Sequence, residues 1–270
     1  MIEIRNLTKS FGELTIWEDV SFSVADGETL AVIGRSGCGK SVLLKHLNAL
    51  MTPNRGEVLI DGVNIHQQDY VSLRKLRQRF GILFQGSALF DSINTFENVA
   101  FPLRYFTNHD EEEIHRKVME ALEMVGLESS AEKETAELSG GMRKRVGLAR
   151  AMILKPDYLM YDEPTSGLDP ETADEINKLI IELSDVLKIT SIVVTHDMHS
   201  VLEVADKVAF LNRQRLDWFG SIEELRKSDH EPLNRFVRAS EYQMHRDPVE
   251  ADSGYGVPQS EDEEKRGEGP

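Results

Sequence analysis

The sequence has little cysteine and no long apolar run. Cys38 is the only cysteine among 270 residues, so no disulfide can form within the chain, which fits a reducing compartment. Unbroken apolar runs reach about four residues, as at 30–33 and 208–211, whereas a membrane-spanning helix needs about 18. The first ten residues lack the apolar core of a signal peptide. We therefore expect a cytosolic chain, which would need another chain to supply any membrane spans.

Positive charge is also scarce. Lys and Arg number 31 against 47 Asp and Glu, which gives a formal net charge of −16. A chain this acidic is a poor candidate for binding nucleic acid through a basic face, and we expect no nucleic-acid partner. Hydrophobic residues make up 40% of the chain, which is enough for a sizeable core in one large or composite domain.

Apolar runs alternate with helical patterns along the chain. Short strands with turns are expected in residues 1–27, and strands buried on both faces are expected at 28–33, 158–161 and 192–194. Helix periodicity is clear at 114–125, behind an acidic first turn, and at 176–183, where Asp169 can cap the helix. A capping box at 221–224 predicts a short last helix. Alternating strands and helices favour an α/β fold with a mainly parallel sheet.

The pattern stops at about Ala239. Residues 239–270 hold nine acidic and three basic residues and are rich in Gly, Pro and Ser. A segment this polar cannot bury enough apolar surface to offset the conformational entropy that it would lose on folding. We therefore predict a disordered, acidic C-terminal tail. An arm that becomes ordered against a partner is the alternative.

A glycine-rich loop follows the first buried strand. It has the pattern G-x-x-x-x-G-K-[ST] and runs into a helix, which is the context that a phosphate-binding loop requires. Its N–H groups would point at phosphate oxygens, Lys40 would face the β- and γ-phosphates, and the Ser41 hydroxyl would ligate Mg²⁺. The candidate nucleotide-binding residues here are Gly34, Arg35, Ser36, Gly37, Cys38, Gly39, Lys40, Ser41 and Val42.

Two carboxylates end the second buried strand. Asp162 would orient Mg²⁺ through water, and Glu163 would act as the general base on the attacking water. Both should lie near the glycine-rich loop, because ligands bind at the carboxyl ends of parallel strands. Ser139, Gly140 and Gly141 open a further helix, so that its N–H groups make a second anion site. A second such site makes sense if it meets a nucleotide held by another copy of the chain.

Six ordered motifs carry a resemblance to a known family. The motifs GRSGCGKS, Gln85, LSGGM, LMYDEP, SGLD and VVTHD together resemble the ATP-binding subunit of an ABC transporter. The resemblance covers roughly residues 1–238. It implies a P-loop ATPase fold with a RecA-like parallel core, an N-terminal antiparallel β subdomain, and a helical subdomain at about 86–155 that docks on a membrane subunit.

The resemblance also assigns roles to single residues. Phe11 matches the aromatic that stacks on adenine, and Gln85 matches the glutamine that touches Mg²⁺ and senses the membrane partner. Ser139–Gly141 match the signature that contacts ATP across a homodimer. Asp169 matches the loop between the two sites, and His196 matches the switch histidine at the γ-phosphate. The activity implied is ATP hydrolysis coupled to transport, with ATP and Mg²⁺, at the cytoplasmic face of a membrane.

One residue departs from the common family pattern. Most members have Gln where this chain has Met142, and Met there resembles the Mla/Mce branch, which is associated with phospholipid or other lipid transport. That branch implies a multi-span permease partner, a lipid-binding partner and a small regulatory subunit. ABC ATPases that power small-solute import remain an alternative.

Other nucleotide-binding classes fit less well. ABC ATPases of DNA repair insert a long coiled coil, but only 99 residues separate Lys40 from Ser139, without sustained heptads. ABC ATPases of translation carry two cassettes in a chain, and this chain has one. A GTP-binding switch needs Asn-Lys-x-Asp, which the sequence at 177–180 lacks. The glycine spacing at 37–42 breaks the nicotinamide-binding pattern.

Overall fold

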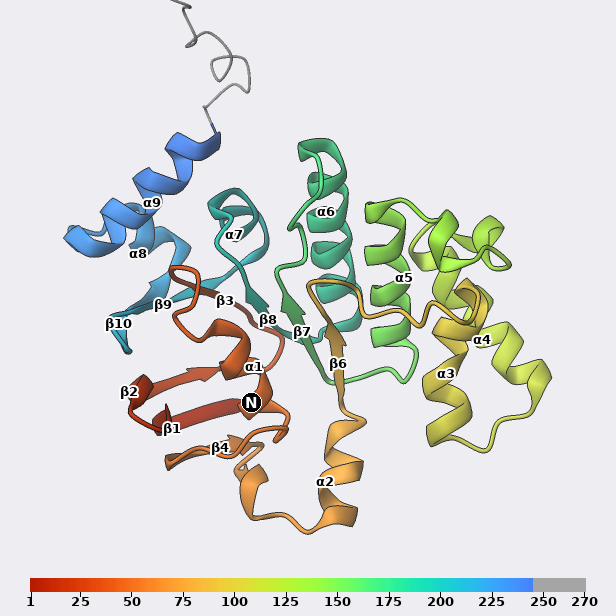
Figure 1. Ribbon diagram of the computed structural model, residues 1–270, viewed down its shortest axis with the longest axis horizontal. Coiled ribbons are helices and arrows are strands. Elements are labelled where there is room, and N and C mark those ends of the chain that lie inside the picture. Colours follow the sequence, from red (N-terminus) through yellow and green to blue (C-terminus); the bar gives the residue numbers. More distant parts are fainter. Residues whose placement is uncertain (245–270) are drawn as a thin grey trace, which may run out of the picture.

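The computed structural model describes residues 1–244, which form two sheets with helices around them (Figure 1). The smaller sheet has the strand order β2-β1-β4-β5 and the larger has the order β10-β9-β3-β8-β7-β6. The bounds of the strands are β1 Ile2–Phe11, β2 Leu14–Val24, β3 Thr29–Ile33, β4 Arg55–Ile60, β5 Val63–Asn64, β6 Phe80–Leu83, β7 Tyr158–Asp162, β8 Thr190–Val194, β9 Lys207–Asn212 and β10 Arg215–Ser221.

The larger sheet is the parallel core. Strands β9, β3, β8, β7 and β6 run parallel to one another, and only the edge strand β10 is antiparallel. Every residue of β3 and of β8 is buried, as expected for strands covered on both faces. The three strands predicted from the apolar runs are β3, β7 and β8. The carboxyl ends of these strands therefore meet at one edge of the sheet, where ligands bind in such folds.

The smaller sheet is antiparallel throughout and corrects one expectation. Strands β1 and β2 are ten and eleven residues long, where short strands were expected. Register shifts interrupt their pairing beyond Ile4, and Asn6 and Asp19 have positive φ angles of 50° and 57°. These irregularities break the alternation of apolar and polar residues that would otherwise have signalled long strands.

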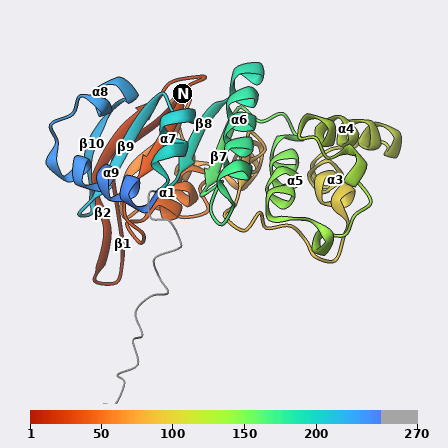
Figure 2. The same ribbon diagram turned by 90° about the horizontal axis from the view of Figure 1, so that it is seen from above.

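The helices cover the sheets and extend to one side. Helices α3, α4 and α5 stand together beside the larger sheet, where the inserted helical subdomain was expected (Figures 1 and 2). Asp110 caps α4 and Asp169 caps α6, with Pro170 in the first position of α6. The bounds are α1 Lys40–Leu47, η1 Ile65–Gln67, α2 Tyr70–Arg77, α3 Thr95–Phe106, α4 Glu111–Met124, η2 Glu128–Ser130, η3 Thr135–Glu137, α5 Gly140–Met152, α6 Pro170–Leu187, α7 Met198–Val204, α8 Ile222–Arg226 and α9 Glu231–Met244.

Helix α9 corrects the expected end of the ordered chain. Ser221 and Glu224 do form a capping box at the start of α8, but α8 is followed by another helix. Leu233 of α9 is fully buried, and Phe236 and Val237 pack against the same cluster beneath β3 and β9. The helix itself runs on to Met244, into the segment predicted to be disordered. Residues 245–270, which hold the rest of the predicted tail, lie outside the described residues.

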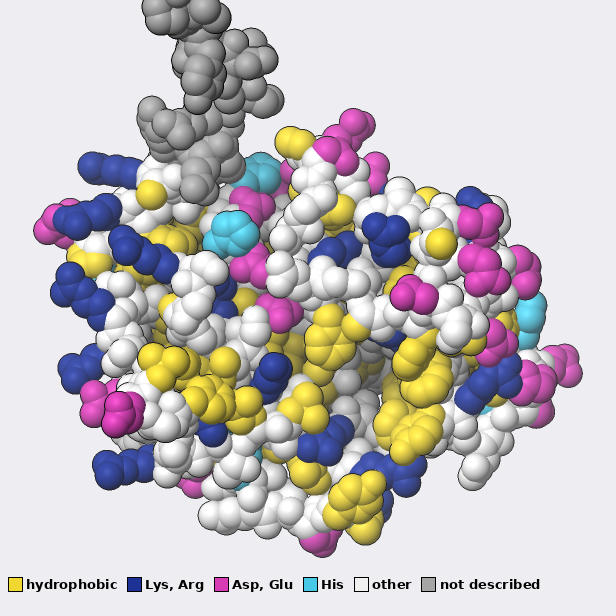
Figure 3. Space-filling view, in the orientation of Figure 1, with side chains coloured by type: hydrophobic (Ala, Val, Ile, Leu, Met, Phe, Trp, Pro, Cys, Tyr) yellow, Lys and Arg dark blue, Asp and Glu magenta, His cyan; other side chains and the backbone are white. Residues whose placement is uncertain are grey.

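Three apolar clusters hold these layers together. One joins α3–α5 to β6, β7 and α6, the second lies between the two sheets and α1, and the third lies under α7, α8 and α9. Figure 3 shows Lys and Arg side chains gathered at the end of the molecule that carries α8 and α9. Within residues 1–244, none of the helices has the length and apolar character that a membrane crossing demands.

Candidate functional site

The glycine-rich loop joins the end of β3 to the start of α1. Gly39 caps α1 in a left-handed conformation, with φ 97°, so the first N–H groups of the helix face the loop without a side-chain cap. A Cβ at Gly39 would lie 2.4 Å from Ile16 Cγ2 and from Trp17 Nε1. The Trp17 indole also donates a hydrogen bond to the Cys38 carbonyl at 3.1 Å. Only glycine fits here, and the close packing fixes a helix N-terminus suited to anions.

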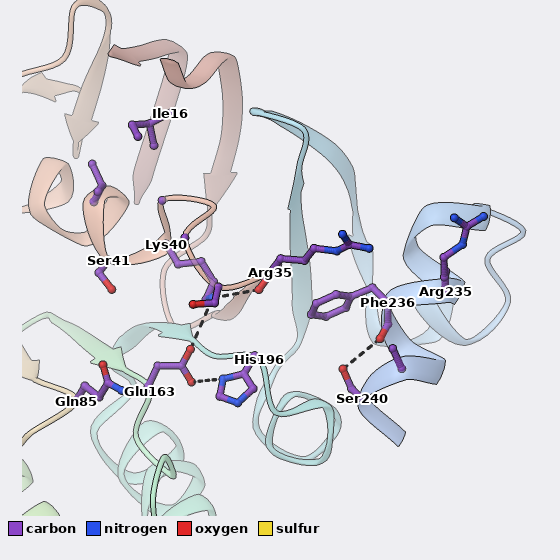
Figure 4. A pocket seen from close by; sticks show the side chains of 16 residues that line it. Ile16, Arg35, Lys40, Ser41, Gln85, Glu163, His196, Arg235, Phe236 and Ser240 are labelled. Carbon is purple, nitrogen blue, oxygen red and sulfur yellow. Dashed lines mark hydrogen bonds and ion pairs between the residues drawn. The ribbon is translucent and has the colours of Figure 1, made fainter. Parts of the chain in front are cut away.

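Lys40 is the first residue of α1, directly after this loop, and is almost fully buried. Its ammonium donates to the Gly34 carbonyl at 3.0 Å and lies 3.6 Å from a carboxylate oxygen of Glu163. Figure 4 shows Lys40 and Glu163 pointing toward each other across the cavity. The loop cation and the expected general base are therefore already paired in one site.

The residues for a divalent cation come together beside Lys40. The Ser41 hydroxyl donates to the Asp162 carboxylate at 3.0 Å, and the Gln85 side chain lines the same cavity as Ser41. Burial raises the pKa of Asp162, while the hydrogen bond from Ser41 and the charge of Lys40 oppose that rise. Hydroxyl, carboxylate and amide oxygens are the hard ligands that Mg²⁺ takes, so this donor set fits the ion.

Glu163 is held in an unusual backbone conformation. Its φ of 50° is left-handed, which is strained for a residue other than glycine. The Glu163 N–H donates to the Val194 carbonyl at 2.8 Å, and Thr195 Oγ1 donates to the carboxylate at 3.3 Å. The Glu163 carboxylate also lies 2.9 Å from Nδ1 of His196. The strained turn thus aims the carboxylate at both His196 and Lys40, although the two residues come from different strand ends.

Lys40, Glu163 and His196 line a cavity of about 890 Å³ at the carboxyl edge of the parallel sheet. Figure 4 shows Gln85, Glu163, His196 and Ser41 around it. Most of the glycine-rich loop lines it as well, from Gly34 to Val42 without Cys38. The sequence prediction of one nucleotide site at this edge therefore has a matching cavity.

Two predicted nucleotide-binding residues lie apart from the cavity lining. Phe11 is 45% exposed at the end of β1, with the Lys9 ammonium 4.9 Å from the ring centroid. Its role against adenine stays a prediction. Cys38 packs inward instead, and burial raises the pKa of its thiol. The half-buried thiol packs against the apolar cluster between the two sheets.

The signature residues Ser139–Gly141 lie at the start of α5, outside the cavity lining. Ser139 caps α5, and its hydroxyl accepts a hydrogen bond from the Met142 N–H at 3.2 Å. A Cβ at Gly141 would lie 2.4 Å from Thr172, whose N–H donates to the Asp169 carboxylate at 3.0 Å. The fold therefore brings the signature and Asp169 together, and it does not bring them to the cavity lining of the same chain.

Sequence reasoning missed several residues of the cavity. Ile16 of β2 lines it, and so do Arg235, Phe236 and Ser240 of α9 (Figure 4). A signal existed for α9, because the apolar residues 233, 236 and 237 have the spacing of one helix face. Lys144 was also missed. It is a lysine only 4% exposed in α5, whose ammonium reaches backbone carbonyls beside the site.

Comparison with known proteins decides the family. The family model described as ABC transporter matches residues 17–166. The chain belongs to the ABC transporter family. Its glycine-rich loop and its 158–163 strand end lie within the matched residues. The prediction of an ABC-type ATP-binding subunit is confirmed. The chain is an ATPase of the kind that is coupled to transport in ABC transporters.

Individual relatives agree with this assignment. A probable ribonucleotide transport ATP-binding protein, mkl, of Mycobacterium leprae is 44% identical over 87% of this chain and 68% of its own length. The intermembrane phospholipid transport system ATP-binding protein MlaF of Haemophilus influenzae is 41% identical over 88% of this chain and 90% of its own. Among solved structures, the dimeric ATP-binding cassette MJ0796 bound to ADP and Pi is similar, with a TM-score of 0.76, 30% identity, and coverage of 82% of this chain and 99% of the other. The predicted fold class is confirmed.

Proposed function

We propose that this ABC ATPase binds ATP in the cavity and hydrolyses it with Glu163 as the general base. The loop N–H groups and Lys40 would hold the phosphates, and Ser41, Gln85 and Asp162 would hold Mg²⁺, Asp162 through water. When bound, Mg²⁺ neutralises phosphate charge. The observation that carries the proposal is the Glu163 carboxylate, which lies between Lys40 and His196 in one cavity with the glycine-rich loop.

The residues of this chain divide the chemistry between them. Glu163 is 12% exposed in its side chain and directed into the cavity, so it can accept a proton from a water molecule at the γ-phosphate. His196 is 58% exposed in its side chain and contacts Glu163 through Nδ1, which leaves Nε2 free to meet the γ-phosphate. Lys40 stabilises the negative charge that develops on the phosphoryl oxygens.

We further propose that two copies enclose two ATP molecules. Ser139, Gly140 and Gly141 lie outside the cavity lining of their own chain, so they reach a nucleotide only on another copy. Asp169 stands next to them through Thr172, where it would join the two sites. Support also comes from the dimeric state of the similar cassette MJ0796. Closure around ATP would move the membrane partner, and hydrolysis would reopen the dimer.

The partner we propose is a multi-span permease at the cytoplasmic face of the membrane. Exposed aromatic residues cluster on and before α3, with ring centroids 4.9 Å apart for Phe90 and Phe101 and 6.3 Å apart for Phe101 and Tyr105. Each of these rings is 43–59% exposed. An exposed apolar patch of this kind marks a site of protein contact. It lies on the helical side of the molecule, where the membrane subunit would dock.

For the transported substrate we propose phospholipid or another lipid. Met142 in the signature and the 41% identity to the phospholipid transport protein MlaF support this choice. A lipid-binding partner and a small regulatory subunit would then belong to the assembly. The similarity to the ribonucleotide transport protein mkl favours a small solute as the second candidate.

The test is to isolate the chain with its native membrane partners in mild detergent and to identify co-purifying proteins and lipids by mass spectrometry. A multi-span permease with a lipid-binding partner and bound phospholipid is the expected result. A permease with a soluble solute-binding protein would keep the ABC ATPase and discard the lipid. No membrane partner at all would contradict the transport proposal and favour an ABC ATPase outside transport.

A further inference from the structure

One face of helix α5 packs unusually closely on the segment that carries Gln85. Lys144, Gly147 and Arg150 are spaced three apart and so share a broad side of the helix. At Gly147, a Cβ would lie 2.9 Å from Leu83 Cδ1 and 3.4 Å from Ser87 Cβ. The absence of a side chain there lets the helix axis approach the backbone of residues 83–88. The two flanking cations can therefore reach carbonyl groups of that backbone.

Arg150 holds the far end of this segment. Its guanidinium donates to the Ser87 carbonyl at 2.6 Å and to the Ala88 carbonyl at 2.7 Å. Ser87 and Ala88 have φ angles of 60° and 47°, two consecutive left-handed residues other than glycine. Such a pair is strained and persists only when its surroundings fix it. The two hydrogen bonds from Arg150 supply that restraint.

Lys144 holds the Gln85 end of this segment and also reaches the backbone of Glu163, after β7. Its ammonium donates to the Gln85 carbonyl at 2.5 Å and to the Glu163 carbonyl at 3.0 Å, and the residue is only 4% exposed. A buried ammonium is costly unless its donors are paired, and here both partners are backbone carbonyls. One side chain of the signature helix thus joins the Gln85 segment to the residue that carries the catalytic carboxylate.

The Glu163 contact matters because of the conformation at that residue. The φ of Glu163 is 50°, and its N–H is already fixed by the Val194 carbonyl. The hydrogen bond from Lys144 fixes the carbonyl on the other side of the same residue. The peptide groups on both sides of the strained Cα are therefore anchored, which sets the direction of the carboxylate toward His196.

We propose that Lys144 is a positioning residue that ties the Gln85 segment to the Glu163 backbone, so that a shift of the signature helix or of Gln85 moves the catalytic carboxylate. The inference rests on the proposed ATP hydrolysis by Glu163, and it adds a physical link between the segment expected to sense a partner and the base. Lys144 itself is not among the residues that line the cavity. Its loss should therefore affect turnover and leave ATP binding nearly intact.

The test uses the full-length protein with Lys144→Met, which keeps the length of the side chain and removes all donors. We expect kcat for ATP hydrolysis to fall at least ten-fold, with the Kd for ATP changed less than three-fold. Lys144→Gln keeps two N–H donors without the charge and should recover part of kcat. Arg145→Met is the matched control on the same helix, because Arg145 pairs with the surface residue Glu175 instead, and it should keep wild-type turnover.

Hydrogen exchange supplies a readout that does not depend on turnover. In Lys144→Met the amides of residues 84–90 and 162–165 should exchange at least ten-fold faster than in wild type, while exchange in β3 stays unchanged. Wild-type kcat together with wild-type exchange in Lys144→Met would overturn the proposal. If wild type itself lacked ATPase activity, the proposed function would fail, and exchange alone would still decide whether Lys144 restrains both segments. Lys144→Gln serves for the same measurements if the Met variant does not fold.

Discussion

Replacing Gly39 by alanine is the sharpest test of the loop geometry. The left-handed conformation, with φ 97°, costs an alanine about 1–2 kcal/mol. Its Cβ would also overlap Ile16 Cγ2 and Trp17 Nε1, each at 2.4 Å, which adds about 1–3 kcal/mol of overpacking strain. We therefore expect a total loss of roughly 2–5 kcal/mol in the free energy of unfolding. At a few degrees per kcal/mol, this lowers Tm by roughly 5–15 °C.

Gly37 provides the matched control within the same loop. It too has a positive φ, of 79°, but a Cβ there would meet nothing within 4 Å. Gly37→Ala should therefore show the conformational cost alone, about 1–2 kcal/mol. Thermal unfolding of both variants with and without ATP and Mg²⁺ measures the difference. Equal Tm values for the two variants, or an ATP-induced stabilisation of Gly39→Ala as large as that of wild type, would refute the reasoning about Ile16 and Trp17.

Two further predictions concern the pH dependence of stability and the residue that contacts the adenine ring of ATP. Burial alone would raise the pKa of Asp61, but hydrogen bonds from the N-terminal ammonium, Arg79 and Tyr158 lower it to about 2. Its stabilisation is therefore present above about pH 4 and is lost as the pH falls through 2. With solvent screening, Asp61→Asn should cost about 1 kcal/mol in urea unfolding at neutral pH and clearly less near pH 2, where about half of the Asp61 carboxyl groups are protonated. Phe11→Leu should weaken ATP binding by about 1–3 kcal/mol in calorimetry. Unchanged affinity there, with weaker binding in Ile16→Ala, would move the adenine contact to Ile16.

Much of the core and the site was readable from local patterns. The runs at 30–33, 158–161 and 192–194 are apolar throughout because both faces of their strands are covered, and that pattern is strong enough to place the loop and Glu163. Asp169 and the capping box at 221–224 are local signals, and each caps its helix as predicted. Ligands bind at the carboxyl ends of parallel strands, and this rule was enough to predict that Lys40 and Glu163 lie close together.

The features that sequence reasoning missed depend on contacts distant in sequence. Lys144 becomes meaningful only when α5 lies against residues 85 and 163, which its position in the chain does not reveal. The polar composition after residue 239 gave no sign that α9 runs on to Met244, and the stripe through Leu233 and Phe236 gains its meaning only when α9 packs on β3 and β9. The left-handed conformation of Glu163 has no local signal either, because the groups that bind its backbone, Val194 and Lys144, are distant from it in sequence.

The central claim is that Glu163 performs hydrolysis within an ATP-bound dimer of two copies. Glu163→Gln keeps the size of the side chain and removes the basic carboxylate, so a loss of about 10²–10⁴ in turnover is expected. The decisive measurement is the mass of this variant in solution by light scattering, with ATP and Mg²⁺ and without nucleotide, alongside its ATPase rate. We predict a dimer that forms only with ATP and turns over negligibly. A variant that stays monomeric with ATP and hydrolyses it at the wild-type rate would contradict both the base and the dimer.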